Sequence, residues 1–177
     1  DSDVARCAAR DAGADGFQFA EGPAWTPDGA LVFSDPNTNV AYRWTPDGRV
    51  RVEREKSGYE DDDFGRLRQP GSNGLAFDAQ GRLTLCEHGN RRVTRIEPDG
   101  KVTVLADRYR GKRLNSPNDL VYRSDGALYF TDPPFGILGY YEGHKATPEL
   151  PTNVYRLDPA NGSLTVVAGD VERPNGL

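Results

Sequence analysis

Apolar residues in this chain come in short alternating clusters rather than in long helical stretches. Leu83 and Leu85 are separated by one polar residue, and so are Val102 and Val104. This period of two is typical of β-strands, whose successive side chains point to opposite faces of a sheet. No window of the sequence has a sustained helical period. The pattern therefore predicts an all-β chain made of short strands.

The strand pattern repeats along the chain in a fixed register. Glu21, Asn73 and Asn118 each stand eight residues before a glycine and fourteen residues before an acidic residue. A polar residue precedes each of these glycines, as in the tight turns of hairpins, which need a positive φ. The second half of each unit repeats as well, with matching arginines at Arg43, Arg95 and Arg156. The third unit carries 16 extra residues, within residues 133–151.

Each unit reads as four strands joined by tight turns. The units span about residues 17–69, 70–114 and 115–172, and a fourth starts at residue 173 with the string RPNGL. Four strands in about 40–50 residues are typical of a β-propeller blade, with a solenoid as the weaker alternative. Because closed propellers have at least about four blades, we expect this chain to be part of a longer single propeller domain, in preference to a ring completed by two copies.

The first residues of the units carry the clearest chemical signal. In a propeller the first strand of each blade lines the central channel, so these residues converge at one end of it. They are Glu21, Asn73, Asn118 and Asn175. One carboxylate among several amide oxygens suits a hard cation such as Ca²⁺. The asparagines have a structural alternative, because Asn at the start of a strand also caps turns.

Composition and charge narrow the range of partners. The chain has 22 Lys and Arg against 27 Asp and Glu, a formal net charge of −5, which argues against a nucleic-acid partner. No apolar run approaches the roughly 18 residues that a membrane helix needs. We expect a soluble protein, cytoplasmic or periplasmic, with no membrane partner. The oligomeric state stays open at this point.

Several strings resemble one known family. They are EGPAW with Glu21, PND at 117–119 followed by GALYFTDPPFG, and the terminal PNGL. In order and spacing they are similar to the gluconolactonase family, which also contains the regucalcin-like senescence marker proteins, and the similarity runs from about Phe17 to Leu177. The resemblance implies a six-bladed propeller of which this chain covers about the first three blades. It also implies a divalent cation, calcium or another, at the channel mouth and a small-molecule lactone as substrate.

The resemblance also implies roles for residues of the ring. Glu21 would be the carboxylate ligand of the cation and Asn175 an amide-oxygen ligand. Asn118 matches a family asparagine beside the cation that ligates it or holds substrate, so it is both a candidate ligand and a candidate catalytic residue. A further aspartate, which serves the family as ligand and proton acceptor, would lie beyond Leu177. In the implied reaction the cation polarises the lactone carbonyl and a carboxylate activates water.

Other polar residues are candidates for the channel mouth by position. We expect Asn73, His88 and Arg113 to bind hydroxyl groups of the substrate, and Asp132 to be a second catalytic residue. Two of these residues have a structural alternative. Asp132 ends a strand and can bond a neighbouring turn, and a lone His at a turn, such as His88, is more often structural. His144 lies in the inserted segment, a candidate lid, where we expect it to be exposed.

Two other functions stay open from the sequence. The first is cleavage of phosphotriesters on the same cation, and the second is a non-catalytic propeller that presents its face to a protein, because fold does not imply function. A binding platform needs no ring of carboxylate and amides. That ring and the resemblance together favour the lactonase.

Overall fold

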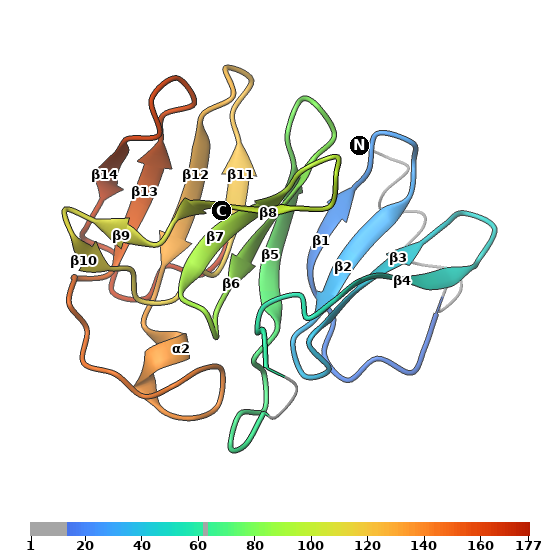
Figure 1. Ribbon diagram of the computed structural model, residues 1–177, viewed down its shortest axis with the longest axis horizontal. Coiled ribbons are helices and arrows are strands. Elements are labelled where there is room, and N and C mark those ends of the chain that lie inside the picture. The colour runs from blue at the N-terminus through green and yellow to red at the C-terminus, as the bar shows by residue number, and fades with distance from the viewer. Residues whose placement is uncertain (1–13, 62–63) are drawn as a thin grey trace.

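The computed structural model describes residues 14–61 and 64–177, and almost all regular structure in these residues is β (Figure 1). Three antiparallel sheets of four strands follow one another, and in each sheet the strands lie side by side in chain order. The prediction of an all-β chain is confirmed. In the described residues no helix is long and apolar enough to cross a membrane.

The strands occupy the following ranges. The first sheet contains β1 (Glu21–Trp25), β2 (Leu31–Asp35), β3 (Val40–Trp44) and β4 (Val50–Glu55). The second contains β5 (Ser72–Phe77), β6 (Leu83–Glu87), β7 (Arg92–Ile96) and β8 (Val102–Ala106), followed by a hairpin of β9 (Arg108–Tyr109) and β10 (Lys112–Arg113). The third contains β11 (Leu120–Tyr122), β12 (Leu128–Asp132), β13 (Asn153–Leu157) and β14 (Leu164–Ala168). The extra residues of the third unit lie between β12 and β13 and include the short helix α2 (Phe135–Leu138).

The same turn joins the first two strands of every sheet. Gly29, Gly81 and Gly126 have φ angles of +82°, +75° and +84°. The N–H of each donates to the carbonyl oxygen three residues earlier, at 3.0, 2.9 and 2.9 Å. A positive φ is what glycine adopts at no steric cost, so the spacing seen in the sequence reflects one turn conformation used three times.

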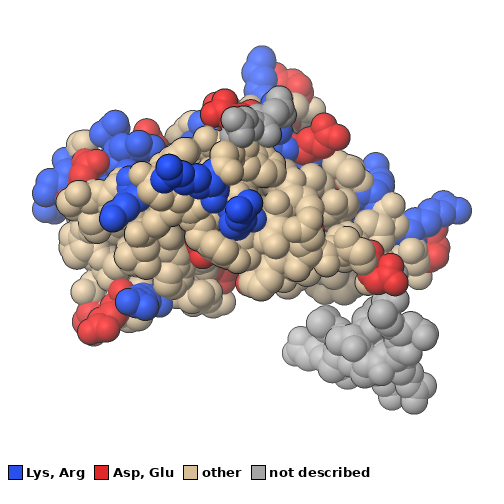
Figure 2. All heavy atoms as spheres, turned by 90° about the horizontal axis from the view of Figure 1, so that it is seen from below, with Lys and Arg blue, Asp and Glu red and all other residues tan. Residues whose placement is uncertain are grey.

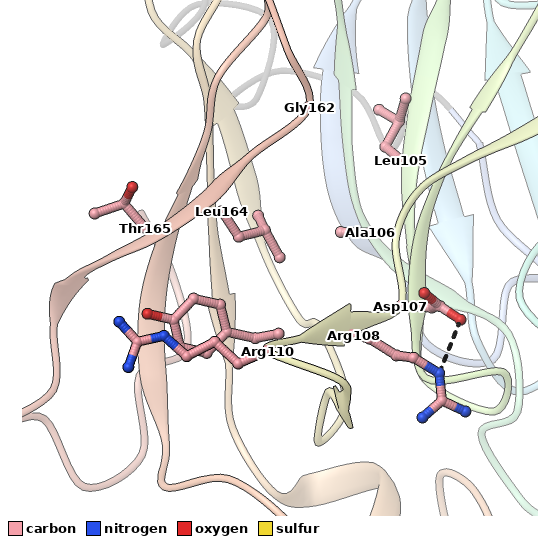
Figure 3. Close-up of a pocket in the computed structure, with 9 residues that line it drawn as sticks. Leu105, Ala106, Asp107, Arg108, Arg110, Gly162, Leu164 and Thr165 are labelled. Atoms are coloured by element: carbon pink, nitrogen blue, oxygen red, sulfur yellow. Dashed lines mark ion pairs between the residues drawn. The ribbon is translucent and has the colours of Figure 1, made fainter.

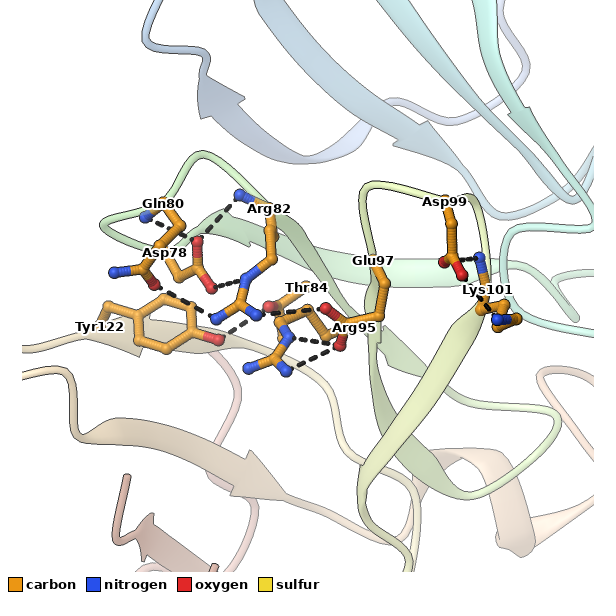
Figure 4. Close-up of polar contacts among 9 residues, drawn as sticks. All are labelled: Asp78, Gln80, Arg82, Thr84, Arg95, Glu97, Asp99, Lys101 and Tyr122. Carbon is orange, nitrogen blue, oxygen red and sulfur yellow. Dashed lines mark hydrogen bonds and ion pairs between the residues drawn. The ribbon is translucent and has the colours of Figure 1, made fainter. Parts of the chain in front are cut away.

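At the end of the sheets that carries these turns, charged side chains tie the strands together. Arg82 bridges Asp78 at 2.7 Å and Glu97 at 3.2 Å within the second sheet, and a hydrogen bond of 2.8 Å between the hydroxyls of Thr84 and Tyr122 continues to the third (Figure 4). The three matching arginines each pair with a carboxylate of their own sheet: Arg43 with Asp28, Arg95 with Glu97 and Arg156 with Asp158. These pairs support the sheets at the end opposite the first residues of the units.

The hydrophobic core lies between the sheets rather than within one of them. The cluster between the first and second sheets consists of Val32, Ala41, Leu75, Leu83 and Leu85. The cluster between the second and third sheets includes Cys86, Val93, Leu120, Phe130 and Tyr155. The second sheet therefore buries both faces against its neighbours, as the blades of a propeller do.

The first strands of neighbouring sheets meet backbone to backbone, and two glycines allow it. Gly22 has a φ of +53°, and a Cβ atom there would lie 2.0 Å from the carbonyl oxygen of Asn73. A Cβ atom on Gly74 would lie 2.7 Å from the carbonyl oxygen of Asn118, which accepts a hydrogen bond from the Gly74 N–H at 2.7 Å. Any larger residue would push β1, β5 and β11 apart.

We expect Gly22→Ala to lower the free energy of unfolding by about 3 kcal/mol or more, because left-handed strain of roughly 1–2 kcal/mol adds to overpacking of about 1–3 kcal/mol. Gly29→Ala is a matched control, since its φ is +82° but nothing lies within 4 Å of the added Cβ. The control should lose only the strain. Denaturant unfolding of both variants measures the difference, and equal losses would contradict the close contact.

Candidate functional site

The four residues that begin the units lie on neighbouring backbones at one end of the sheets. Glu21 is joined to Asn73 through the Gly22 contact, and Asn73 to Asn118 through Gly74. Asn175 follows, because its carbonyl oxygen accepts a hydrogen bond of 2.8 Å from the hydroxyl of Thr131, next to the Asn118 strand. The structure thus places the predicted ring residues in sequence around one end of the first strands.

The ring residues differ in how far they are buried. Asn118 is 2% exposed, Glu21 and Asn73 are half-buried, and Asn175 is exposed. The donors of the ring are one carboxylate and three amide oxygens, all hard ligands of the kind that calcium prefers. Among the described residues, no group of three His, Cys, Asp or Glu side chains gathers as a metal site. The ring therefore differs from carboxylate-rich or imidazole-rich sites by its reliance on amides.

His88 is buried against the ring. It follows β6, is 1% exposed, and its Nε2 atom lies 3.1 Å from Nδ2 of Asn118. On its other side, Nδ1 lies 3.0 Å from a carboxylate oxygen of Glu142, a residue of the segment between β12 and β13. Sequence reasoning placed His88 near the substrate but missed Glu142, because an isolated acidic residue in an inserted loop has no spacing signal.

Asp132 holds the chain just before the third ring residue. Its two carboxylate oxygens accept hydrogen bonds from the N–H groups of Asn115 and Ser116, each at 2.9 Å. Asp35 in the first sheet accepts from the N–H groups of residues 18 and 19, at 2.9 and 3.3 Å, which stand at the same distance before Glu21. Asp132 is fully buried. Its contacts are those of a clamp, and its catalytic role stays a prediction.

The matching residue of the second sheet cannot form this clamp. The residue three positions before Asn73 is Pro70, which has no N–H to donate, and the N–H of Gly71 instead donates to the carbonyl of Pro36 at 3.0 Å. Glu87 replaces the aspartate and turns to its own sheet, where it accepts from Arg92 at 2.6 Å. Asp35, Glu87 and Asp132 therefore share a position in the repeat, but only Asp35 and Asp132 hold the segment that leads into the first strand.

Burial has a further effect on Asp132. Loss of hydration raises the pKa of its carboxyl group from 3.8 to about 7, against the lowering effect of the N–H groups of Asn115 and Ser116 and of the Arg91 charge. A carboxyl group that titrates near neutral pH has the proton affinity of an acid or base catalyst. In this structure both of its oxygens are used by backbone N–H groups.

Arg113 and His144 lie further from the ring. The guanidinium of Arg113 donates to the carbonyl oxygen of Asn90 at 3.2 Å, and no hydrogen bond in the described chain joins it to a ring residue. His144 is exposed, as expected, but its Nε2 atom lies 2.9 Å from the hydroxyl of Tyr59. Substrate binding by Asn73, His88 and Arg113 stays a prediction.

A cavity of about 360 Å³ lies elsewhere, at the outer edge of the second and third sheets. Its lining includes Asp107, Arg108 and Arg110 from the region of the β9–β10 hairpin and Leu164 of β14, and the Asp107–Arg108 ion pair of 3.9 Å stands at its side (Figure 3). None of the predicted site residues lines it. We place the candidate site at the ring, because the predicted ligand residues lie on adjacent backbones there and none of them lines the cavity.

Comparison with known proteins gives a consistent result. A family model described as SMP-30/Gluconolactonase/LRE-like region matches residues 19–177. A gluconolactonase of Zymomonas mobilis subsp. mobilis is 40% identical over 165 residues, which cover 91% of this chain and 46% of that protein. The structure of a gluconolactonase from Xanthomonas campestris superimposes with a TM-score of 0.78 at 41% identity, covering 90% of this chain and 50% of the other.

A virginiamycin B lyase from Staphylococcus aureus has the same fold at a TM-score of 0.57 and 17% identity, covering 89% of this chain and 44% of the other. The propeller class predicted from the repeats is confirmed by these neighbours. The chain spans about half the length of the relatives that it matches.

The raised pKa of Asp132 predicts a pH dependence of stability. Between pH 4 and 7 the folded chain holds a proton on Asp132 that the unfolded chain has released, so the free energy of unfolding should fall as the pH rises, by up to roughly 4 kcal/mol. We expect Asp132→Asn to remove this slope, and the exposed Asp170→Asn to keep it. Urea unfolding across the pH range tests both, and an unchanged slope in Asp132→Asn would refute the assignment.

Proposed function

The chain belongs to the SMP-30/gluconolactonase/LRE-like family, and from this membership we propose that the protein containing it hydrolyses sugar lactones. The observation that carries the proposal is the ring of Glu21, Asn73, Asn118 and Asn175 on adjacent first strands. A propeller that serves only as a binding platform needs no ring of this composition.

We propose that a divalent cation, calcium by preference, is held by Glu21, Asn118 and Asn175. The donor set supports this, because it consists of oxygen atoms with one negative charge. Asn118 is suited to the role, since its Nδ2 is used by His88 and no hydrogen bond in the described chain uses its Oδ1. When bound, the cation would polarise the lactone carbonyl and stabilise the negative charge that develops on its oxygen.

The residues of this chain have separate tasks in that reaction. Glu21 would supply the negative charge that retains the cation, and the amide oxygens of Asn118 and Asn175 would be further ligands. Asn73 is half-buried, and its backbone lies between those of Glu21 and Asn118 in the ring; its amide would bond a sugar hydroxyl. Asp132 holds the segment before Asn118, so the position of that strand depends on it.

The surface at this end has no field of a single sign. In the view from below, uncharged residues cover much of the middle of the face, Lys and Arg stand over its upper and left part, and Asp and Glu stand mostly near the rim (Figure 2). An anionic or cationic substrate is usually drawn in by a surface field of one sign. A sugar lactone needs no such field, because its hydroxyl groups and carbonyl bind through hydrogen bonds.

The proposal predicts that a chelator removes gluconolactone hydrolysis and that added calcium restores it, because the carbonyl would lose its polarising charge. The measurement is acid release by the protein that contains this chain at its natural length. Activity that is indifferent to the chelator would refute the metal mechanism, and calcium binding without hydrolysis of any lactone would refute the substrate class.

Substitution of Glu21 tests whether its carboxylate is a ligand of the cation. Glu21→Gln keeps the size and polarity of the side chain but removes its charge, so we expect calcium affinity to fall on the order of tenfold or more, with activity falling in parallel. Glu55→Gln on the outer strand β4 is the control, because Glu55 is exposed and β2 and β3 lie between it and the strand of Glu21. Calorimetric titration measures affinity, and equal affinities of both variants would remove Glu21 from the ligand set.

A further inference from the structure

We propose that Glu142 and His88 act as a positioning pair for Asn118, fixing its side-chain amide so that Oδ1 rather than Nδ2 is presented to the channel. The proposal deepens the function given above and rests on it in one respect, the use of Asn118 Oδ1 as a ligand. It adds Glu142, a residue outside the repeat, to the machinery of the site.

The hydrogen-bonding capacity of the three groups dictates one arrangement. Nδ2 of Asn118 can only donate, so Nε2 of His88, 3.1 Å away, must accept and carries no proton. A neutral imidazole then has its proton on Nδ1, which faces Oε2 of Glu142 at 3.0 Å. A carboxylate is an acceptor, so the Nδ1 proton faces a matching group, although this contact does not have hydrogen-bond geometry.

Burial makes each of these contacts matter. Nδ1 of His88 and Oε2 of Glu142 are both buried and lie 3.0 Å apart, but in the described chain neither atom makes a hydrogen bond. A buried polar atom left unpaired costs about 1–3 kcal/mol. Each atom is therefore the nearest group that can satisfy the other.

Glu142 is carried by a segment that is anchored on both sides of it. The carbonyl oxygen of Tyr141 accepts hydrogen bonds from the N–H groups of residues 68 and 69, at 2.7 and 2.8 Å. Gly143 lies so close to Gly136 that a Cβ atom there would be 2.4 Å from the Gly136 carbonyl oxygen. The backbone at Glu142 therefore has little freedom, as a residue that positions another requires.

The Asn118 amide can adopt either of two orientations, because its oxygen and NH₂ ends have similar shapes. If the acceptor on His88 were lost, the Asn118 amide could turn and present its NH₂ group, which repels a cation. Groups that hydrogen-bond to metal ligands typically contribute 10- to 100-fold to metal affinity through this orientation. His88 and Glu142 would act on the cation in this indirect way, without touching it.

The first test needs no metal. In the metal-free protein of natural length, NMR signals of the ring nitrogens report which nitrogen of His88 carries the proton. We expect the neutral ring to be protonated on Nδ1, and the downfield Asn118 side-chain N–H signal to lose its shift in Glu142→Ala. A ring protonated on Nε2 would overturn the proposal, because Asn118 would then have to present its oxygen to His88.

The second test measures calcium affinity by calorimetry. We expect Glu142→Ala to weaken calcium binding by about 10- to 100-fold, and Glu142→Gln to restore most of it, since the amide oxygen still accepts the Nδ1 proton. Glu149→Ala is the matched control, because Glu149 lies in the same segment and accepts a hydrogen bond of 3.1 Å from the backbone N–H of Arg113. Equal losses in Glu142→Ala and Glu149→Ala would overturn the proposal.

A double-mutant cycle separates positioning from a general structural effect. If Glu142 acts through the Asn118 amide, Glu142→Ala should cause no further loss of calcium affinity in an Asn118→Ala background. The same loss in both backgrounds would refute the proposal. A wild-type protein that binds no calcium would refute the proposed metal function instead, while the His88 protonation pattern still decides the positioning proposal.

Discussion

Backbone contact between the first strands of neighbouring sheets is the constraint on which the candidate site depends. Gly22 and Gly74 bring three strands together at distances that no side chain would permit. The residue before each glycine is thereby carried to the same end of the channel. Hydrophobic packing between the sheets stabilises the arrangement, but packing alone tolerates small shifts, whereas the contact of Gly22 with the Asn73 carbonyl does not.

A second contact fixes where Glu21 and Asn118 lie along their sheets. The carboxylates of Asp35 and Asp132 each hold two successive N–H groups of the segment that leads into the first strand. The second sheet lacks this contact, because Pro70 interrupts the pair of donors. There the carbonyl of Pro36, from the first sheet, takes the N–H of Gly71, so the second sheet is held by its neighbour.

Much of the fold was predictable because its determinants are local and repeat. Turn glycines, alternating apolar residues and the spacing to Glu21, Asn73 and Asn118 all follow from conformations that each unit must adopt alone. The contact between His88 and Glu142 was not predictable, because it joins the turn after β6 to the inserted segment, which has no counterpart in the other units. The clamp of Asp132 was foreseen only as an alternative, since a strand-end carboxylate looks the same in the sequence whether it faces the channel or the backbone.

The anchored segment between β12 and β13 belongs to the third sheet, yet it contacts the linker before the second sheet and reaches His88 at the end of β6. A change in the length of this one loop would therefore alter the surroundings of Asn118 while every strand kept its sequence. In a protein built from repeats, the sequence of such a loop can change the selectivity of the site without altering the repeated strands that form the fold. Grafting this loop between relatives would thus alter specificity while leaving the ring residues and the strands unchanged.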